Sequence, residues 1–440
     1  MSLYKTESFL NSLCLIFLVL VLMYATKGHA EGLSEELETQ VDHLLQKSQA
    51  NGRFAGLSIL LMDSSGKKWI RHYGFRDIEQ QIPPDDHTIY ELGSITKTFT
   101  RLLLANQSDI KLSDPISSYL PNGVQDPKPA GQEIHFQDLA LHTGIRLGTP
   151  CVPVGIDMEH ATLKCYGIDQ DPTSVDPWKN VTQNDLFQFI NANSTAFIQF
   201  PQFFAAPGLY YEYSNTGMAL LGDLIAGHHG TTYEHLLRKV ILRPLRMHET
   251  YFQMPCEYDG SCLNLAKVYR NTADGKNWAP SSYWHLSAGI PAAGALRSSI
   301  SDMAHYLRLE MGLLKKSRLN PAVAISQTEL PDAEKTLLSN ICQAGDPAWK
   351  PCNKSVSPQF EGWPSDAGKK VFFHAGETGS SQSMILFSQD REIGMVLLSN
   401  SVPGTGSSDS AEHIPNDLSL CISQLAGIYP SSYKLCDKFN

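Results

Sequence analysis

Positive charge is scarce in this chain, and no basic stripe is present. Its 440 residues include 35 Lys and Arg against 45 Asp and Glu, which gives a formal net charge of −10. An acidic surface is repelled by phosphate backbones and by anionic lipid headgroups. We therefore expect no nucleic-acid partner and no electrostatic docking to a membrane.

Long apolar runs are missing after the first thirty residues. The uninterrupted apolar run Leu13–Met23 has eleven residues, whereas a membrane-spanning helix needs about 20. Lys5 before this run and Gly28-His29-Ala30 after it are typical of a secretory signal peptide over residues 1–30. We predict cleavage before Glu31, a periplasmic or secreted protein, and no stable membrane span afterwards. An uncleaved anchor is the alternative.

Metal-binding patterns are also missing. The chain contains no Cys-x-x-Cys or His-x-x-x-His cluster, so it predicts no metal site, and nothing in it calls for another cofactor. Cys14 would leave with the signal peptide. The other eight cysteines form sequence-near pairs, for which local disulfides are the simplest connectivity: Cys151/Cys165, Cys256/Cys262, Cys342/Cys352 and Cys421/Cys436.

Three short motifs carry the chemistry, and the chain lacks the Gly-x-Ser-x-Gly element of an α/β-hydrolase esterase. The motifs are Ser94-Ile95-Thr96-Lys97, Tyr213-Ser214-Asn215 and His374-Ala375-Gly376. They supply a hydroxyl nucleophile, two groups able to take its proton, an amide to orient a substrate, and a cationic or hydrogen-bonding third wall. Each pattern recurs elsewhere, as in His142-Thr143-Gly144, and alone indicates only a surface pair, a turn or a polar residue. Their order and local contexts favour the functional interpretation.

The context of Ser94 is the start of a helix. Gly93 precedes it and an apolar, helix-compatible run follows over Thr98–Ala105. Lys97, three residues on, would share a helix face with Ser94, and the helix start would favour a developing oxyanion. Lys97 can accept the proton of Ser94 only if its pKa is lowered. Tyr213 is the other acceptor, and the sequence leaves the two as a pair.

The other two motifs are predicted in a loop and a strand. Tyr213 and Asn215 come just before an apolar helical segment, and His374 follows the β-like stretch Val371–Phe373. Gly376 would let a substrate backbone approach closely, and a peptide or lactam could pair along that strand edge.

Beyond the motifs, the chain from about Leu57 to about Ala426 resembles the class C β-lactamase-related serine hydrolases of the penicillin-recognising superfamily. Within that group, Cys256–Cys262 and Asn416–Leu420 resemble AmpH-type DD-carboxypeptidase/endopeptidases. The wider resemblance is carried by the following stretches: Gly93–Thr100, Lys111–Ile116, Asp138–Gly144, Pro244–Tyr251 and Ala293–Met303.

This resemblance implies a serine acyl-enzyme mechanism without a metal. Ser94 would be the nucleophile, with Lys97 and Tyr213 shuttling its proton. The backbone N–H groups of Ser94 and Glu377 would hold the oxyanion. The residues implied in substrate binding are Asn215, His374, Ala375 and Gly376. His374 stands where β-lactamases proper carry a Lys, and a histidine is largely neutral near pH 7.

The predicted fold is mixed α/β (α+β): an antiparallel sheet from both chain ends, flanked by helices, with a mainly helical subdomain inserted. We place the α/β subdomain at residues 31–92 plus 285–428, the helical subdomain at 93–284 and a C-terminal tail at 429–440. Helix Ser34–Gln49, hairpins 57–73 and 383–400, and a closing helix His413–Ala426 are expected. The active site would lie between the subdomains.

The function that these features predict is an exported, monomeric DD-carboxypeptidase or endopeptidase on peptidoglycan stem peptides. A class C-like β-lactamase is the first alternative, because acylation is shared and only the deacylation rate differs. An esterase on the same fold and a catalytically silent peptide-binding protein are the others. Intact Ser94, Lys97, Tyr213 and Asn215 count against the silent protein.

Overall fold

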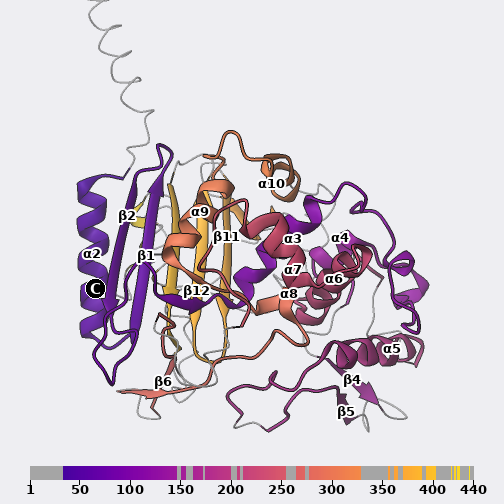
Figure 1. Ribbon diagram of the computed structural model, residues 1–440. Helices are drawn as coiled ribbons and strands as arrows, with labels where there is room; N and C mark the ends of the chain where they lie inside the picture. The colour runs from indigo at the N-terminus through magenta and orange to yellow at the C-terminus, as the bar shows by residue number, and fades with distance from the viewer. Residues whose placement is uncertain are drawn as a thin grey trace, which may run out of the picture.

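A seven-stranded antiparallel sheet forms the centre of the molecule (Figure 1). In this computed structural model the described residues are 33–145, 150–154, 162–171, 174–199, 206–208, 212–253, 264–272, 277–328, 355–356, 361–364, 370–388, 393–402, 418, 421–422, 424–426 and 436. The strand order across the sheet is β2 (Lys68–Gly74), β1 (Gly56–Asp63), β13 (Ile393–Ser399), β12 (Gln382–Ser388), β11 (Lys370–Glu377), β10 (Glu361–Pro364) and β9 (Ser355–Val356). Strands from the two ends of the chain therefore join in the middle, where β1 pairs with β13 from Leu57↔Ser399 to Asp63↔Ile393.

Both faces of this sheet are buried, which explains the continuous apolar runs of its central strands. In β1, Leu57, Ile59 and Leu61 point into one hydrophobic core, while Leu60 and Met62 point into the other. The same alternation continues in β12 and β13, because successive side chains of a strand point to opposite faces. The sheet is thus a wall shared by two cores.

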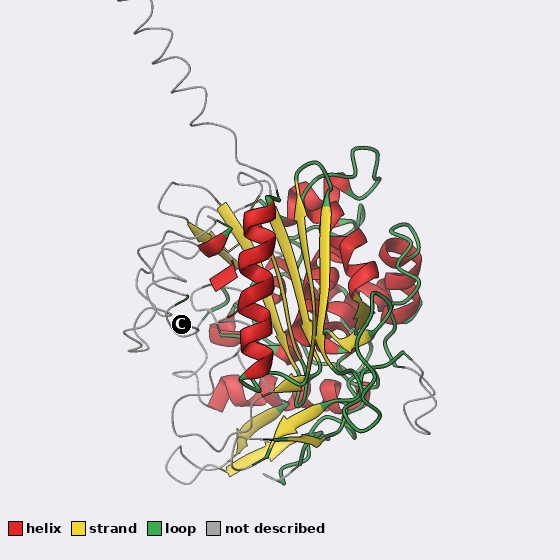
Figure 2. Cartoon of the chain, turned by 90° about the vertical axis from the view of Figure 1, so that its left-hand side faces the viewer, coloured by secondary structure: helices red, strands yellow, loops and turns green. Residues whose placement is uncertain are grey.

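Helix α2 (Glu35–Ala50) covers the outer face of the sheet, as Figure 2 shows from that side. Its N-cap is Ser34, whose Oγ accepts from the Leu37 N–H at 3.2 Å. Val41 and Leu45 are fully buried against the sheet. The predicted amphipathic helix Ser34–Gln49 is confirmed to within one residue at each end. Leu418, Cys421 and Ile422 of the C-terminal segment join the same core.

The other face carries the helical part of the chain, which lies on the opposite side of the sheet from α2 (Figure 1). Its helices are α3 (Thr96–Ala105), α4 (Phe136–Ala140), α5 (Gln183–Gln199), α6 (Asn215–His228), α7 (Tyr233–Leu237) with the π-helical η5 (Arg238–Leu242), α8 (Pro291–Gly294), α9 (Ile300–Glu310) and α10 (Asn320–Ser326). Short 3-10 turns are η1 (Gly93–Ile95), η2 (Ile116–Ser118) and η3 (Pro129–Gly131). Small sheets pair β3 (Ile89–Glu91) with β8 (Arg297–Ser299), β4 (Cys151–Val154) with β5 (Thr162–Cys165), and β6 (Tyr269–Asn271) with both β7 (Trp278–Pro280) and β14 (Ser401–Val402).

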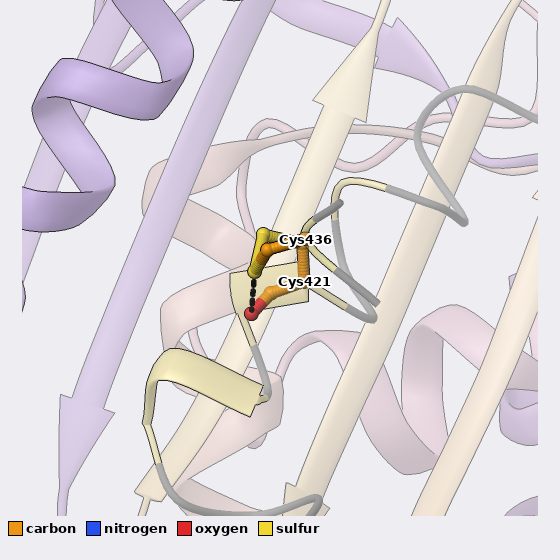
Figure 3. Close-up of a disulfide and its surroundings, with 2 residues drawn as sticks. All are labelled: Cys421 and Cys436. Carbon is orange, nitrogen blue, oxygen red and sulfur yellow. Dashed lines mark hydrogen bonds between the residues drawn. A yellow bond between two sulfur atoms is a disulfide. The ribbon is translucent and has the colours of Figure 1, made fainter. Parts of the chain in front are cut away.

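The predicted mixed fold and both predicted hairpins are confirmed: β1 pairs with β2, and β12 pairs with β13. The exact division at residues 92 and 284 stays a prediction. Two of the four predicted disulfides are present, Cys151–Cys165 across the β4–β5 pair and Cys421–Cys436 near the C-terminus (Figure 3).

Other predictions fall on residues that the structure does not describe. These are the signal peptide over residues 1–30, the pairs Cys256/Cys262 and Cys342/Cys352, and most of the tail at 429–440. The closing helix is described only in part, with helical residues between 418 and 425. Among the described residues, no helix combines the length and apolarity needed to cross a membrane.

Candidate active site

Ser94 lies in the 3-10 turn η1, which links β3 to α3. The prediction placed it in the first turn of a buried helix, and the structure refines this, because the α-helix proper begins at Thr96. Every residue from Thr96 to Leu104 is buried, whereas Ser94 is half-buried. The hydroxyl therefore sits at the accessible end of an otherwise enclosed helix.

Two glycines let the end of strand β11 pack directly on this turn. A Cβ on Gly376 would lie 2.0 Å from the Leu92 carbonyl oxygen, and a Cβ on Gly93, where φ is +49°, would lie 2.8 Å from the Glu377 backbone nitrogen. Only glycine fits such contacts. The sequence predicted that Gly376 makes room for substrate, but the space beside its Cα is taken by the nucleophile turn. The same contact brings the backbone of Glu377 next to Ser94.

A buried carboxylate ties the two segments together. Thr378 Oγ1 donates to Glu91 Oε2 at 2.8 Å, and Glu91 Oε1 accepts from Arg297 at 3.4 Å and from the Trp284 N–H at 2.9 Å. Glu91 and Arg297 are almost wholly buried. Because Glu91 ends β3 and Thr378 follows β11, these bonds fix the spacing between the Ser94 turn and the end of β11.

Lys97 approaches Ser94 from inside the protein and is fully buried. Its Nζ lies 2.9 Å from Ser94 Oγ, 2.8 Å from Asn215 Oδ1 and 2.6 Å from the Ala293 carbonyl oxygen. Burial, and next the nearby charge of Arg101, lower the pKa of Lys97 well below its ordinary value. The sequence analysis required a lowered pKa for Lys97 if it is to act as a base, and the surroundings of Lys97 in the structure lower it.

Tyr213 and Asn215 reach the same place from the start of α6. Tyr213 Oη donates to Ser94 Oγ at 2.6 Å, and the Lys97 Nζ lies 4.7 Å from the centre of the Tyr213 ring. Between them, Ser214 is the N-cap of α6, with its Oγ accepting from the Gly217 N–H at 2.9 Å. The predicted loop just before a helix is confirmed, and four of the predicted residues meet within hydrogen-bonding distance.

His374 and Ala375 lie side by side in β11 but face opposite ways, as neighbours in a strand must. His374 is on the side of the nucleophile turn and is buried, and its Nδ1 donates to the Ala375 carbonyl oxygen at 2.8 Å. The Ala375 side chain packs on the outer core. A substrate in front of Ser94 would therefore meet Ala375 only through its backbone.

The third wall is electrically neutral. Burial, followed by the charge of Arg101, lowers the pKa of His374 to about 3. Of the two possibilities that the sequence left for this position, the structure favours the hydrogen-bonding one over the cationic one. With the proton on Nδ1, the neutral ring offers Nε2 as an acceptor. The Glu377 side chain, two residues past Ala375, is exposed and accepts from Gln382 Nε2 at 2.9 Å.

Three contributors to this site were missed by the sequence analysis. The Ala293 carbonyl is a backbone group, so its role carries no side-chain signal. Arg101 is buried one turn after Lys97 on α3, and the four-residue spacing of two basic residues in an apolar helix was a signal that could have been used. His142, noted in a repeated pattern and within the Asp138–Gly144 stretch but given no role, lies against Tyr213 with ring centroids 4.6 Å apart.

Comparison with known proteins agrees with this geometry. The β-lactamase family matches residues 41–415 of the chain. The protein is a member of the β-lactamase family of serine hydrolases. Among curated proteins, it is 24% identical to Protein flp of Staphylococcus aureus strain MW2, over 84% of this chain and 64% of that protein. It is 26% identical to a β-lactamase of Escherichia coli K12, over 80% of this chain and 86% of that one. The chain thus spans less than two thirds of the length of the Staphylococcus relatives.

Solved structures show the same fold. The octameric penicillin-binding protein homologue from Pyrococcus abyssi superposes with a TM-score of 0.67 at 24% identity, over 90% of this chain and 78% of that one. A class C β-lactamase superposes with a TM-score of 0.64 at 19% identity, over 91% and 98%. The match to the β-lactamase family over residues 41–415 confirms the predicted resemblance to β-lactamase-related serine hydrolases, and the solved structures show that the fold is shared.

Proposed function

We propose that this serine hydrolase forms an acyl-enzyme through Ser94 and acts on peptidoglycan stem peptides as a DD-carboxypeptidase or endopeptidase. One observation carries the proposal: Ser94 Oγ lies 2.9 Å from Lys97 Nζ and 2.6 Å from Tyr213 Oη. A serine hydroxyl with two proton-handling groups at hydrogen-bonding distance is the arrangement needed for nucleophilic attack on a carbonyl.

The surroundings of Lys97 support its role as the base for acylation. Asn215 Oδ1 and the Ala293 carbonyl oxygen can only accept hydrogen bonds, so they take up both N–H groups of a neutral amine. The lone pair is then directed to Ser94 Oγ. As Oγ bonds to the substrate carbonyl carbon, the hydroxyl proton passes to Lys97, and the backbone N–H groups of Ser94 and Glu377 hold the oxyanion.

Tyr213 completes the cycle by serving the leaving group. As the carbon–nitrogen bond of the substrate breaks, the Tyr213 hydroxyl gives its proton to the leaving nitrogen and regains one from Lys97, which lies over its ring. Asn215 binds the acyl side chain of the substrate through its Nδ2 amide, because its Oδ1 is engaged by Lys97. Water then attacks the ester carbonyl and releases Ser94.

An esterase is the second candidate, and the state of His374 favours it. A buried His374 whose pKa lies at about 3 offers no fixed positive charge to a substrate carboxylate. The binding of an uncharged ester does not need a positive charge on His374. D-alanyl peptides and β-lactams carry a carboxylate, which a positive charge at this position would bind. The two candidates therefore differ in what they require of this wall.

Product release from three substrates distinguishes the candidates. Native protein is incubated with an N-acylated D-Ala-D-Ala peptide, p-nitrophenyl acetate and benzylpenicillin, and free D-Ala, p-nitrophenol and penicilloate are measured. Ser94→Ala is the inactive variant. Ser65→Ala is its matched control, since Ser65 opens another Ser-x-x-Lys pattern, on an exposed turn where its Oγ donates to Asp63. Release of D-Ala that needs Ser94 but not Ser65 supports the peptidase.

The other outcomes each contradict that proposal. Fast penicilloate release without D-Ala would identify a β-lactamase, and p-nitrophenol release alone would identify an esterase. If no product forms from any of the three substrates, the catalytically silent peptide-binding protein is the hypothesis that remains.

We further propose that the protein is exported and works as a monomer. The two disulfides, Cys151–Cys165 and Cys421–Cys436, support an oxidising compartment. Cell fractionation with N-terminal sequencing should find a mature chain that begins at Glu31. Light scattering should give the mass of one chain. A cytoplasmic product that retains residues 1–30, or a higher assembly such as the octamer of the Pyrococcus neighbour, would contradict this part of the proposal.

A further inference from the structure

His142 occupies an unusual backbone position directly after α4. Its φ is +61°, in the left-handed region that costs a residue with a Cβ about 1 kcal/mol or more. The turn is held by the Asp138 carbonyl oxygen, which accepts from the Thr143 and Gly144 N–H groups at 2.8 and 3.0 Å. When neighbouring groups hold a residue in a strained backbone conformation, the direction of its side chain often has a function.

That direction is the segment that carries Tyr213. The Glu212 N–H donates to the His142 carbonyl oxygen at 3.0 Å, and the Ser214 N–H donates to His142 Nδ1 at 3.2 Å. The backbone donors on both sides of Tyr213 are therefore bound by one residue. The His142 and Tyr213 rings also lie against each other, with centroids 4.6 Å apart and planes tilted by 44°.

The contact with Ser214 requires a neutral imidazole. Nδ1 can accept the Ser214 N–H only when it carries no proton, so the ring proton is on Nε2. The surroundings agree, because burial, and next the charge of Arg101, lower the pKa of His142 well below its ordinary value. The acceptor is thus retained throughout the neutral range.

We propose that His142 is a positioning residue that holds the Tyr213 hydroxyl on Ser94, an inference that rests on the proposed acylation of Ser94. Its role is distinct from that of Ser214, whose Oγ caps α6 on the far side of Tyr213. In this proposal His142 acts through Tyr213 and not on the substrate. It fixes the backbone N–H groups of Glu212 and Ser214, the residues on either side of Tyr213, and limits the tilt of the phenol ring.

Two substitutions separate the acceptor from the bulk of the ring. His142→Asn keeps a side-chain oxygen that can accept from the Ser214 N–H, and asparagine tolerates positive φ. His142→Gly removes the acceptor but suits the backbone even better. Both are compared with native protein in single-turnover acylation by benzylpenicillin and by p-nitrophenyl acetate, well below the melting temperature of each variant.

The expected result is a loss in rate rather than in binding. His142→Gly should acylate about 100-fold more slowly at an unchanged KM, since a small misplacement of a reacting group has that order of effect. His142→Asn should recover the rate to within about fivefold of native. Equal rates for native protein and folded His142→Gly would overturn the inference. If the glycine variant does not fold, a large rate loss in folded His142→Asn would overturn it instead.

A double-mutant cycle tests whether the effect passes through Tyr213. In a Tyr213→Phe background the hydroxyl to be positioned is gone, so His142→Gly should lower the remaining rate by less than about threefold. The full 100-fold loss in that background would show that His142 acts elsewhere. Native protein that neither substrate acylates would refute the proposed function itself, and with it this inference. Acylation of the native protein, with folded His142→Gly acylated at the same rate, refutes the inference alone.

Discussion

At the scale of single residues, the site depends on a lysine that is buried away from solvent. Lys97 is fully buried and surrounded by three oxygen atoms, and the buried guanidinium of Arg101 lies one helical turn away. Both burial and the neighbouring positive charge disfavour its ammonium form. The chemistry that the motif requires is therefore produced by surroundings drawn from α3, α6 and α8.

Replacing Lys97 with Met should slow acylation and change how stability responds to pH. We expect acylation of Ser94 to fall by about 10²–10⁴-fold, the usual contribution of a general base. The unfolded chain binds a proton at Lys97 up to its ordinary pKa, whereas the folded chain has already lost it. Native stability therefore rises with pH in this window relative to Lys97→Met.

Melting temperatures of both proteins between pH 6 and 9 check that linkage. As pH increases, the melting temperature of the native protein should rise relative to that of Lys97→Met. A difference in melting temperature that stays constant or shrinks over this range would contradict a lowered pKa at Lys97.

Removing the charge of Arg101 should shift the pH profile of acylation. Without that charge the pKa of Lys97 rises, so in Arg101→Met the acid limb of kcat/KM should move to higher pH. Arg101→Lys retains a charge and serves as the matched control, with an acid limb close to that of the native protein. An Arg101→Met profile that superposes on the native one would show that burial alone sets the pKa of Lys97.

At the scale of elements, the site depends on how closely β11 packs on η1. Gly376→Ala would place a Cβ 2.0 Å from the Leu92 carbonyl oxygen, so either the strand or the Ser94 turn has to move. We expect acylation to fall by about 100-fold or more and stability to decrease. Gly227→Ala in α6 is the matched control, because a Cβ there meets nothing within 4 Å, and it should raise stability by up to about 1 kcal/mol.

Acylation rates and urea unfolding of the two alanine variants provide the comparison. Native-like acylation in Gly376→Ala would contradict a close contact between β11 and the nucleophile turn.

Much of the element level could be predicted from the sequence, because it depends on local patterns. Apolar patterns located α2 and α3, and short β-like runs on either side of a turn located the β1–β2 and β12–β13 hairpins. Contacts between distant segments were not predictable in the same way. The Ala293 carbonyl is 196 residues from Lys97, and His142 is 72 residues from Ser214. Such contacts depend on tertiary packing, and a single sequence shows no periodic pattern from which they could be predicted.

At the scale of the whole molecule, the sheet unites two cores that no single segment could build. Trp69 lies in the outer core with α2, while Trp178 lies in the inner core with the helical part. Since the central strands bury alternate residues in each core, losing one core would expose a full face of the sheet. The two cores should therefore unfold together.

Fluorine NMR of 5-fluorotryptophan-labelled protein in increasing urea follows both cores at once. The resonances are assigned by Trp69→Phe and Trp178→Phe. We predict coincident transitions for the two positions. Separate midpoints would instead support two independently stable subdomains, with boundaries near residues 92 and 284.

The central claim is that Ser94, activated by Lys97 and Tyr213, becomes covalently acylated. The intact mass of the protein, followed over time with benzylpenicillin, tests it most directly. The account predicts an added mass of one benzylpenicillin on native protein and on Ser65→Ala, absent from Ser94→Ala and located by peptide mapping at Ser94. Persistence of the adduct indicates a slowly deacylating peptidase. An adduct that survives Ser94→Ala, or maps to another residue, would contradict the account.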